Sequence, residues 1–551
     1  MSFLHALKVR FSKRQQMLWP QAASHSTSLL RCLFSRVVGS SGTAVSGVTE
    51  LAESHADVKW YRAMLAATVT TDGHVMLDGN ASWPDMASPL LFVRNFYAPC
   101  WESVMAKGET KDLSRQRKFV VMGTPGIGKS AFGLYILWRA LAEGKTVIYK
   151  TRKRDAKAFL FRDGKVFDVQ RIVSLPEITE PSTILIVDGM EPPSENAFTV
   201  LITSPLRERW KEFVKTEGVQ ELIFPVFSFD EMLKLRASAF SSKVGCNEPA
   251  VINRYNKWGG SVRHVLTHPE ETWQKNLTNN AANMTLAQLK ASCGDAARDR
   301  AAAAQHNVLH LKAACELENC ELLPSNPRYY DFSHGELASE FVQELVYTQL
   351  QANETKDFFA FLRASAGTPA LAILRGVQYE HFALRALAEG GKFQLKQLRH
   401  DDDPVFSGIL TARGPLLELP RSSMRSFSKL TDVSLEAPAV WKPLSKNCCA
   451  IDGVVCTAEL VLAVNATVSS KHPLYLTNMR GGLDSIANTL GLSEGEISFL
   501  WLVPDDIFDQ MKVPSPLKVG SKVLNPKGLR LHNVGKRVVQ YAVCVPIPTM
   551  K

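Results

Sequence analysis

The chain has 551 residues, of which 45% are hydrophobic and 21% charged. These proportions are ordinary for a globular protein, and at roughly 150 residues per domain the length predicts about three domains. The formal net charge of +10 suits a polyanionic partner such as nucleic acid. The absence of an apolar run of about eighteen residues predicts no membrane-spanning helix, and ten cysteines without a CxxC pair indicate reduced thiols.

The first segment is basic. Residues 1–49 contain no Asp or Glu and many Ser, a composition that resembles an organellar transit peptide and equally a disordered basic tail. We therefore assign 1–89 to a basic N-terminal region without a predicted fold, and expect the first domain to begin at residue 90.

Residues 90–285 show strands that alternate with helices. A helix is predicted from Ala131 to Glu143, ended by Gly144. Alternation of this kind predicts an α/β domain whose parallel sheet is covered on both faces. The strands are expected at 119–122, 146–149, 183–187 and 198–203.

A phosphate-binding loop lies between the first strand and the first helix. It matches GxxxxGK[ST] completely, and glycine lets several backbone N–H groups point at one phosphate. Lys129 is expected to meet the β and γ phosphates, and Ser130 to bind Mg²⁺. The loop therefore predicts binding of ATP or GTP with Mg²⁺ through Gly123, Thr124, Pro125, Gly126, Ile127, Gly128, Lys129 and Ser130.

Three further residues are candidates for this site. Asp188 ends the strand 183–187, where a carboxylate would hold Mg²⁺; an Asp that caps the following loop is the alternative. The next residue is Gly189, so the usual water-activating Glu is missing. Ser204 could sense the γ phosphate or simply form a turn, and Arg263 could reach the phosphates from a helical lid or lie on the surface.

The remainder predicts a connector and a second α/β domain. Ala-rich, charged stretches predict a helical connector or lid over residues 286–365. The domain at 366–551 is expected to hold a helix at 371–389 and another near 482–490. Strands are expected at 450–456, 460–468 and 497–503.

Several stretches together resemble the NTPase module of Crinkler effectors, which is related to modules in the retrotransposon hot spot proteins of trypanosomes. The resemblance covers roughly residues 90–551, while the N-terminal secretion and translocation module of typical Crinklers is not recognisable in 1–89. It implies a P-loop NTPase of the AAA+/STAND kind and a secreted effector acting in a host nucleus; a mitochondrial or other intracellular location is the alternative. The stretches are Gly123–Ser130, Phe132–Trp138, Val187–Gly189, Thr203–Pro205, Trp210–Phe213, Lys215, Pro225–Glu231 and Gly259–Arg263.

In these families the NTPase is often followed by a domain similar to restriction endonucleases. The resemblance implies a helix Glu at Glu380, a strand-end acid at Asp452, both as Mg²⁺ ligands, and the (Glu/Gln)-x-(Lys/Thr) pair at Asn465 and Thr467. Alternation places Asn465 and Thr467 on one face of the strand 460–468. Asn465 stands where Glu or Gln is expected, and Lys471 could replace the missing lysine if the chain turns back.

The sequence thus predicts an NTP-binding protein, with ATP hydrolysis expected, whose C-terminal domain acts on DNA as a Mg²⁺-dependent nuclease. Two alternatives stay open: a nucleotide-controlled switch that binds nucleic acid or protein without cleavage, and a P-loop kinase. The NTPase domain could also form oligomers.

Overall fold

The structure is a computed structural model. The chain divides into two compact units, Met1–Ser46 and Gly47–Lys551, and all described residues belong to the second. They run from 47 to 550 without 80, 85, 87, 109–116, 153–156, 206–209, 216–217, 292–307, 318–319, 369–370, 400–409, 411–413, 435–437, 445–450, 471–473, 476–496, 513–516, 520–521 and 525–537.

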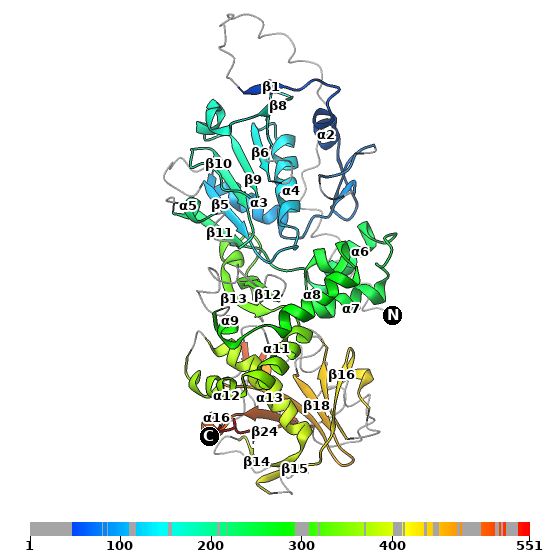
Figure 1. Ribbon diagram of the computed structural model, residues 1–551, viewed down its shortest axis with the longest axis vertical. Coiled ribbons are helices and arrows are strands. Elements are labelled where there is room, and N and C mark those ends of the chain that lie inside the picture. The colour runs from blue at the N-terminus through cyan, green and yellow to red at the C-terminus, as the bar shows by residue number, and fades with distance from the viewer. Residues whose placement is uncertain are drawn as a thin grey trace, which may run out of the picture. The chain divides into compact units, whose positions relative to one another are not determined.

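The first sheet has eight strands in the order β1-β8-β7-β6-β9-β10-β5-β11 (Figure 1). The five strands from β6 to the edge strand β11 are parallel, as the alternation predicted. A run of antiparallel strands, which the sequence analysis missed, extends it on the β6 side. The parallel strands are β6 Val147–Thr151, β9 Ile184–Asp188, β10 Phe198–Ile202, β5 Lys118–Met122 and β11 Val219–Ile223; the antiparallel ones are β7 Ala158–Arg162, β8 Lys165–Val169 and β1 Val48–Glu50.

Both faces of this sheet are buried. Successive side chains of a strand point to opposite sides, and both sets lie in hydrophobic clusters. In β9, Ile184 and Ile186 join one hydrophobic cluster, while Leu185 and Val187 join another. Helix α4 (Lys129–Ala142) packs closely on the sheet, since a Cβ on Gly133 would lie 2.3 Å from the Ile202 side chain. The other helices of this region are α2 Ala56–Leu65, α3 Tyr97–Gly108 and α5 Lys211–Val214, with 3-10 turns at Ile172–Ser174 and Pro176–Thr179.

The folded region begins earlier than the expected residue 90. Strand β1 pairs with β8, and α2 buries Trp60, Tyr61 and Met64 in the core shared with β5 and α4. The apolar spacing of Trp60, Tyr61 and Met64 on one helix face was the available signal. A small sheet follows, made of β2 Thr68–Val69, β3 Val75–Met76 and β4 Leu90–Leu91.

The segment after β11 is helical, but the expected helical connector contains a hairpin. Strands β12 (Leu309–Ala313) and β13 (Phe332–Leu337) pair antiparallel, so the expectation of helix throughout residues 286–365 is wrong there. The alternation of apolar Leu309 and Leu311 with polar His310 favours a strand, and all three side chains are buried. The helices are α6 Phe229–Ala239, α7 Glu248–Trp258, the π-turn η4 Arg263–Thr267, α8 Glu271–Ala282, α9 Leu286–Ala291, α11 Glu340–Asn353 and α12 Thr355–Ala364; η5 Ala314–Glu316 and η6 Pro327–Tyr330 are 3-10 turns.

The C-terminal region contains a second eight-stranded sheet, in the order β15-β14-β24-β21-β19-β18-β17-β16. It mixes parallel pairs such as β19–β21 with antiparallel pairs such as β18–β19. The predicted strands at 450–456 and 460–468 are confirmed in shortened form, and the strand predicted at 497–503 is confirmed in full. The helix expected near 482–490 lies outside the described residues. The strands are β14 Gly391–Gln397, β15 Leu416–Leu419, β16 Ser423–Phe427, β17 Ala439–Pro443, β18 Gly453–Cys456, β19 Val461–Ala466, β21 Ile497–Val503 and β24 Val538–Cys544.

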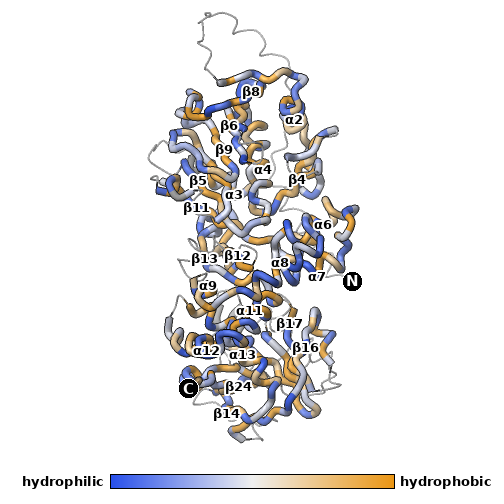
Figure 2. Tube along the Cα trace, in the orientation of Figure 1, coloured by the Kyte–Doolittle hydropathy of each residue, from blue (hydrophilic) through white to orange (hydrophobic). Residues whose placement is uncertain are grey.

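Helix α13 (Ala372–Glu389) covers one face of this sheet and confirms the predicted helix. Val464 and Leu500 share its hydrophobic cluster, whereas Ala463 and Trp501 belong to the cluster on the other face. Figure 2 shows the contrast between the hydrophilic helices α7 and α8 and the hydrophobic segments of the central strands. Smaller elements are α16 Asp505–Phe508, the 3-10 turn Leu430–Asp432 and the strands β20 Leu474–Tyr475, β22 Leu517–Val519 and β23 Lys522–Leu524. Within the described residues, no helix combines the length and hydrophobicity that crossing a membrane requires.

Candidate functional sites

The loop Gly123–Ser130 connects β5 to α4 in a conformation that depends on glycine. Gly123, Gly126 and Gly128 all have positive φ, at 143°, 82° and 84°, where side chains with a Cβ are strained. A Cβ on Gly123 would lie 2.9 Å from Ile127 and 3.0 Å from the Phe224 carbonyl oxygen. The loop therefore wraps tightly and ends at the N-terminus of α4, whose free N–H groups favour an anion.

Lys129 is the first residue of α4, and its side chain extends back into this loop. Its Nζ donates hydrogen bonds to the carbonyl oxygens of Gly123 (2.8 Å) and Thr124 (2.9 Å). Burial and the nearby Arg263 guanidinium lower the pKa of Lys129 to about 7, although Asp188 opposes the shift. The loop thus holds a desolvated cation beside a second positive charge, an arrangement that an incoming anion would stabilise.

The acid and the polar residues expected near the loop lie at the same sheet edge. Asp188 ends β9, and Ile202 pairs with it at the end of β10, directly before Thr203 and Ser204. Because β10 lies between β5 and β9, Thr203 and Ser204 fall between the loop and Asp188. The main-chain N–H of Thr203 donates to the Val121 carbonyl oxygen (3.0 Å), which fixes this end of β10 against β5.

A second segment covers the loop from the helical side. Ser261 Oγ donates to the Pro125 carbonyl oxygen (3.3 Å), and the Arg263 N–H donates to the Gly126 carbonyl oxygen (3.3 Å). A Cβ on Gly126 would lie 2.7 Å from the Arg263 Cβ. Arg263 begins the π-turn η4, a feature often found at functional sites. The structure thus places Arg263 beside the loop, as expected of a lid residue.

The hairpin β12–β13 touches the loop as well, which the sequence analysis missed. The main-chain N–H of Leu311 donates to Thr124 Oγ1 at 3.0 Å. On the other side, the Tyr97 hydroxyl donates to the Gly128 carbonyl oxygen at 3.1 Å. No local sequence signal joins residues so far apart, so only the folded chain reveals these contacts.

In the C-terminal region, Asp452 and Asn465 are neighbours. The main-chain N–H of Asp452 donates to Asn465 Oδ1 (3.0 Å), and Asp452 Oδ2 accepts from the main-chain N–H of Ala466 (2.8 Å). The antiparallel pairing of β18 with β19 sets this arrangement, because Gly453 pairs with Val464. The structure therefore brings the predicted strand-end acid Asp452 next to Asn465.

Glu380 lies on α13 above the same hairpin. One turn later, Leu384 packs at 3.1 Å from where a Cβ on Gly453 would be, and one turn earlier Gly376 lies over Val468. Glu380 is buried and lies on α13 between Gly376 and Leu384, the residues that make these two contacts. The side chains of Val464, Ala466 and Val468 face α13, so the alternating Asn465 and Thr467 point to the opposite face of the sheet.

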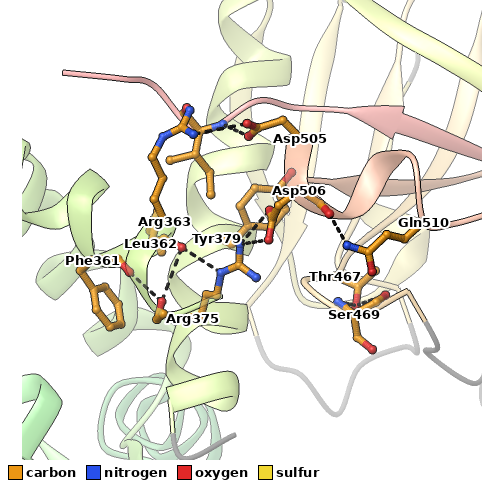
Figure 3. A network of polar contacts seen from close by, with 12 residues as sticks. Phe361, Leu362, Arg363, Arg375, Tyr379, Thr467, Ser469, Asp505, Asp506 and Gln510 are labelled. Carbon is orange, nitrogen blue, oxygen red and sulfur yellow. Dashed lines mark hydrogen bonds and ion pairs between the residues drawn. The ribbon is translucent and has the colours of Figure 1, made fainter. Parts of the chain in front are cut away.

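Thr467 directly follows β19. Its Oγ1 accepts from the main-chain N–H of Ser469 (3.1 Å), a bond drawn in Figure 3, and Thr467 is 4% exposed. The same view shows Arg375 of α13 paired with Asp506 at 2.8 Å, a contact that ties the helix to the segment after β21. Lys471 lies outside the described residues.

A buried cluster of charged residues beside α13 was not predicted. Lys442 Nζ lies 3.0 Å from Glu340 Oε2 and 2.9 Å from His381 Nδ1, and His381 Nδ1 lies 3.0 Å from Glu344 Oε2. Burial and Lys442 lower the pKa of His381, against the effect of Glu344. Glu340 and Glu344 are one turn apart on α11, and a charged pair at that spacing is ordinarily solvated, so the sequence offered no signal.

The described residues contain no group of three or more His, Cys, Asp and Glu side chains arranged to hold a metal ion. Asp188 and Ser130 at the first site and Asp452 at the second offer the oxygen donors that Mg²⁺ prefers, whereas Glu380 lies on α13, on the side of the sheet opposite to the one that Asn465 faces.

Comparison with known proteins relates the chain to Crinkler effectors. No protein-family model matches the chain. Crinkler effector protein 15 of Phytophthora infestans is 24% identical over 447 residues, and Crinkler effector protein 16 of the same organism is 25% identical over 451 residues. Each alignment covers 78% of this chain but only 63% of the relative, so the chain spans less than two thirds of the length of the relatives it matches.

Proposed function

We propose that the chain binds a purine nucleoside triphosphate with Mg²⁺ at the loop Gly123–Ser130, in a P-loop NTPase domain of the AAA+/STAND kind. The observation that carries this proposal is the state of Lys129. Its ammonium is held by two carbonyl oxygens within the loop and lies near Arg263. Phosphate oxygens would neutralise both cations and accept the N–H groups at the start of α4.

Mg²⁺ fits the same site because Ser130 and Asp188 offer a hydroxyl and a carboxylate oxygen. When bound, the ion would neutralise phosphate charge. Hydrolysis is proposed to be slow, because Gly189 follows Asp188 and Glu191 is engaged elsewhere. Glu191 Oε1 accepts from the main-chain N–H of Phe213 at 2.9 Å, which holds this carboxylate at α5.

The proposal is tested by calorimetry with ATP and GTP, with and without Mg²⁺. Lys129→Ala removes charge-assisted hydrogen bonds worth about 1.5–3 kcal/mol each, so we expect at least roughly hundredfold weaker binding. Lys165→Ala is the matched control, since Lys165 is exposed on β8 and paired with Glu50. Unchanged affinity in a folded Lys129→Ala protein would refute the assignment.

We further propose that the C-terminal region is a restriction-endonuclease-like domain that acts on DNA as a Mg²⁺-dependent nuclease. The proximity of Asp452 and Asn465 at one hairpin end supports this second function, whereas Glu380 lies on the helix that covers the other face of the sheet. Asp452 would offer Mg²⁺ a carboxylate oxygen there, and the ion would activate water against a phosphodiester.

Plasmid cleavage in Mg²⁺ or Mn²⁺ tests the nuclease. Asp452→Ala removes a metal ligand and should abolish cleavage while DNA binding persists, because binding depends on Lys and Arg contacts to phosphate. Asn465→Glu restores the expected acid and should raise activity. If neither the wild type nor Asn465→Glu cleaves single- or double-stranded DNA, the non-cleaving switch becomes the better proposal.

The names of the relatives from Phytophthora infestans describe effector proteins, and we propose the same role here: a secreted protein that acts in the nucleus of a host. The basic residues 1–49 offer a mitochondrial alternative. A fluorescent reporter fused to residues 1–60 distinguishes the two, because accumulation of the reporter in mitochondria contradicts the effector proposal for this terminus.

A further inference from the structure

A pocket of about 920 Å³ lies beside α13, away from the loop Gly123–Ser130 and from Asp452. Its walls come from α7, α11, α13 and the edge strand β16, and Lys442 and Pro443 of β17 form its floor. The contact between α7 and α11 is fixed by a hydrogen bond from Ser339 Oγ to the Lys257 carbonyl oxygen at 2.6 Å. A volume of this size is typical of sites that enclose an organic ligand.

Two of the three carboxylates that line the pocket are neutralised by neighbouring cations. Glu340 pairs with Lys442 (3.0 Å), and Glu344 contacts both Arg385 and His381. Lys442 is 7% exposed and Glu340 is 9% exposed, so this charged floor is paired and rigid. These acids therefore do not make the pocket repel an anion.

The rim of the pocket carries cationic side chains that are not paired with carboxylates in this way. In the part of the chain that the structure describes, no ion pair joins a carboxylate to Lys257, Arg421 or Arg425. Five cationic and three acidic side chains line the pocket, which leaves a net excess of two positive charges. The pocket therefore favours a ligand with more than one negative charge.

The spacing of these cations suits a chain of phosphates. Arg425 lies on β16 and Arg421 lies two residues before this strand begins; four residues of strand span roughly 13 Å. The hydroxyls of Ser422 and Ser426 lie between and beyond them in the sequence and also line the pocket. A single phosphate would engage one such arginine, whereas a strand with successive phosphates would engage both.

Apolar side chains in the same pocket supply surface for bases. Phe341 lines it with Lys257 Nζ at 5.6 Å from its ring centre, and Met424 is 40% exposed. Proteins that bind single strands combine a basic groove with side chains on which bases stack. A duplex is too wide to enter a pocket of this volume.

We propose that this pocket binds a segment of single-stranded nucleic acid, with phosphates on Arg421, Arg425 and Lys257 and a base against Phe341. The inference rests on the proposed action of the C-terminal region on DNA, and its test is separate from cleavage.

The test measures binding of a fluorescent twelve-nucleotide oligothymidylate to the full chain by anisotropy, in EDTA and without nucleotide. Arg421→Ala/Arg425→Ala should weaken binding at least tenfold. It should also reduce the salt slope by about 1.4, because each phosphate contact on a single strand contributes about 0.7. Lys356→Ala/Lys392→Ala is the control with the same charge change: both lysines are exposed and neither lines the pocket. We expect less than twofold change.

Three results overturn the inference: no binding by the wild type, equal weakening by both double variants, or displacement of the oligonucleotide by thymidine monophosphate at equal nucleotide concentration. The last result would indicate a site for small anions. Phe341→Leu retains apolar volume and should still weaken binding by removing the aromatic face. Failure of the nuclease proposal looks different, because then Asp452→Ala and the wild type both fail to cleave while the pocket variants still lose oligonucleotide affinity.

Discussion

The two strand ends that carry the candidate sites differ in how their polar groups are satisfied. At the loop Gly123–Ser130, Lys129 Nζ donates to two backbone oxygens and, among the residues that the structure describes, to no carboxylate. Arg263 adds to the positive field. At the hairpin β18–β19, Asp452 and Asn465 bond each other and the backbone.

At the first site a ligand would therefore lower the free energy of a buried charge. At the second site the polar groups already bond to one another and to the backbone. An anion at Lys129 would relieve desolvation and repulsion together. Mg²⁺ at Asp452 would instead compete with the hydrogen bond from the Ala466 N–H. We therefore expect the first site to bind its nucleotide tightly. We expect the second site to gain less free energy from binding Mg²⁺.

The largest expected effect is on the pH dependence of nucleotide binding. The pKa of Lys129 is about 7 in the ligand-free protein, and a triphosphate binds the protonated ammonium. Affinity should therefore fall as pH rises above about 7, approaching tenfold per pH unit. Calorimetry between pH 6.5 and 9 measures this fall. Lys129→Met should abolish it, and a flat profile in the wild type would contradict the charge assignment.

The same lysine affects stability with the opposite sign. Its pKa of about 7 in the folded protein lies below the value of about 10.4 in an unfolded chain, so the unfolded state binds more protons between these two pH values. Lys129 therefore destabilises the ligand-free protein at low pH, and this cost diminishes as pH rises through that window. The difference in unfolding free energy between the wild type and Lys129→Met measures it.

The next largest effect concerns Gly259, which follows α7 and lies against Ala338, the residue after β13. Gly259 has φ 58°, and a Cβ there would lie 2.3 Å from the Ala338 carbonyl oxygen. Gly259→Ala should reduce the free energy of unfolding by about 2–4 kcal/mol, combining backbone strain and overpacking. Gly144→Ala is the control, because Gly144 also has positive φ but open space around it. Its cost should be only about 1 kcal/mol, and equal costs for both variants would show that the contact with Ala338 is unimportant.

The sequence predicted the parts of these sites that are local. The central parallel strands, the helix after the loop and the alternation of Leu462 and Val464 depend on short-range patterns, and these predictions are confirmed. The contact between Thr124 and Leu311 and the cluster around Lys442 join residues far apart in the chain, so no local pattern indicates them. The hairpin β12–β13 was predicted as helix because its Ala-rich neighbours dominated that stretch.

A smaller effect is expected at Asp188. Asp188→Asn removes the charge proposed to hold Mg²⁺ but keeps the shape, so the Mg²⁺-dependent part of ATP affinity should fall roughly tenfold, a change of about 1.4 kcal/mol. Affinity measured in EDTA should change far less. Titrating ATP with and without Mg²⁺ gives both values. Equal losses in the two conditions would indicate that Asp188 acts on Lys129 alone, as its influence on the pKa of Lys129 allows.

The smallest effect is expected at Asn465, where the comparison between the two strand ends is sharpest. Asn465→Ala removes the acceptor for the Asp452 N–H, but that N–H also donates to the Val464 carbonyl oxygen at 3.0 Å. The donor is not left unsatisfied, so the free energy of unfolding should fall by only about 0.5–1.5 kcal/mol. ATP affinity should stay within twofold of the wild type. Urea unfolding and calorimetry on one preparation measure the two quantities. A loss of ATP affinity without a loss of stability would show that the hairpin end communicates with the loop, and the two sites could then no longer be treated as separate.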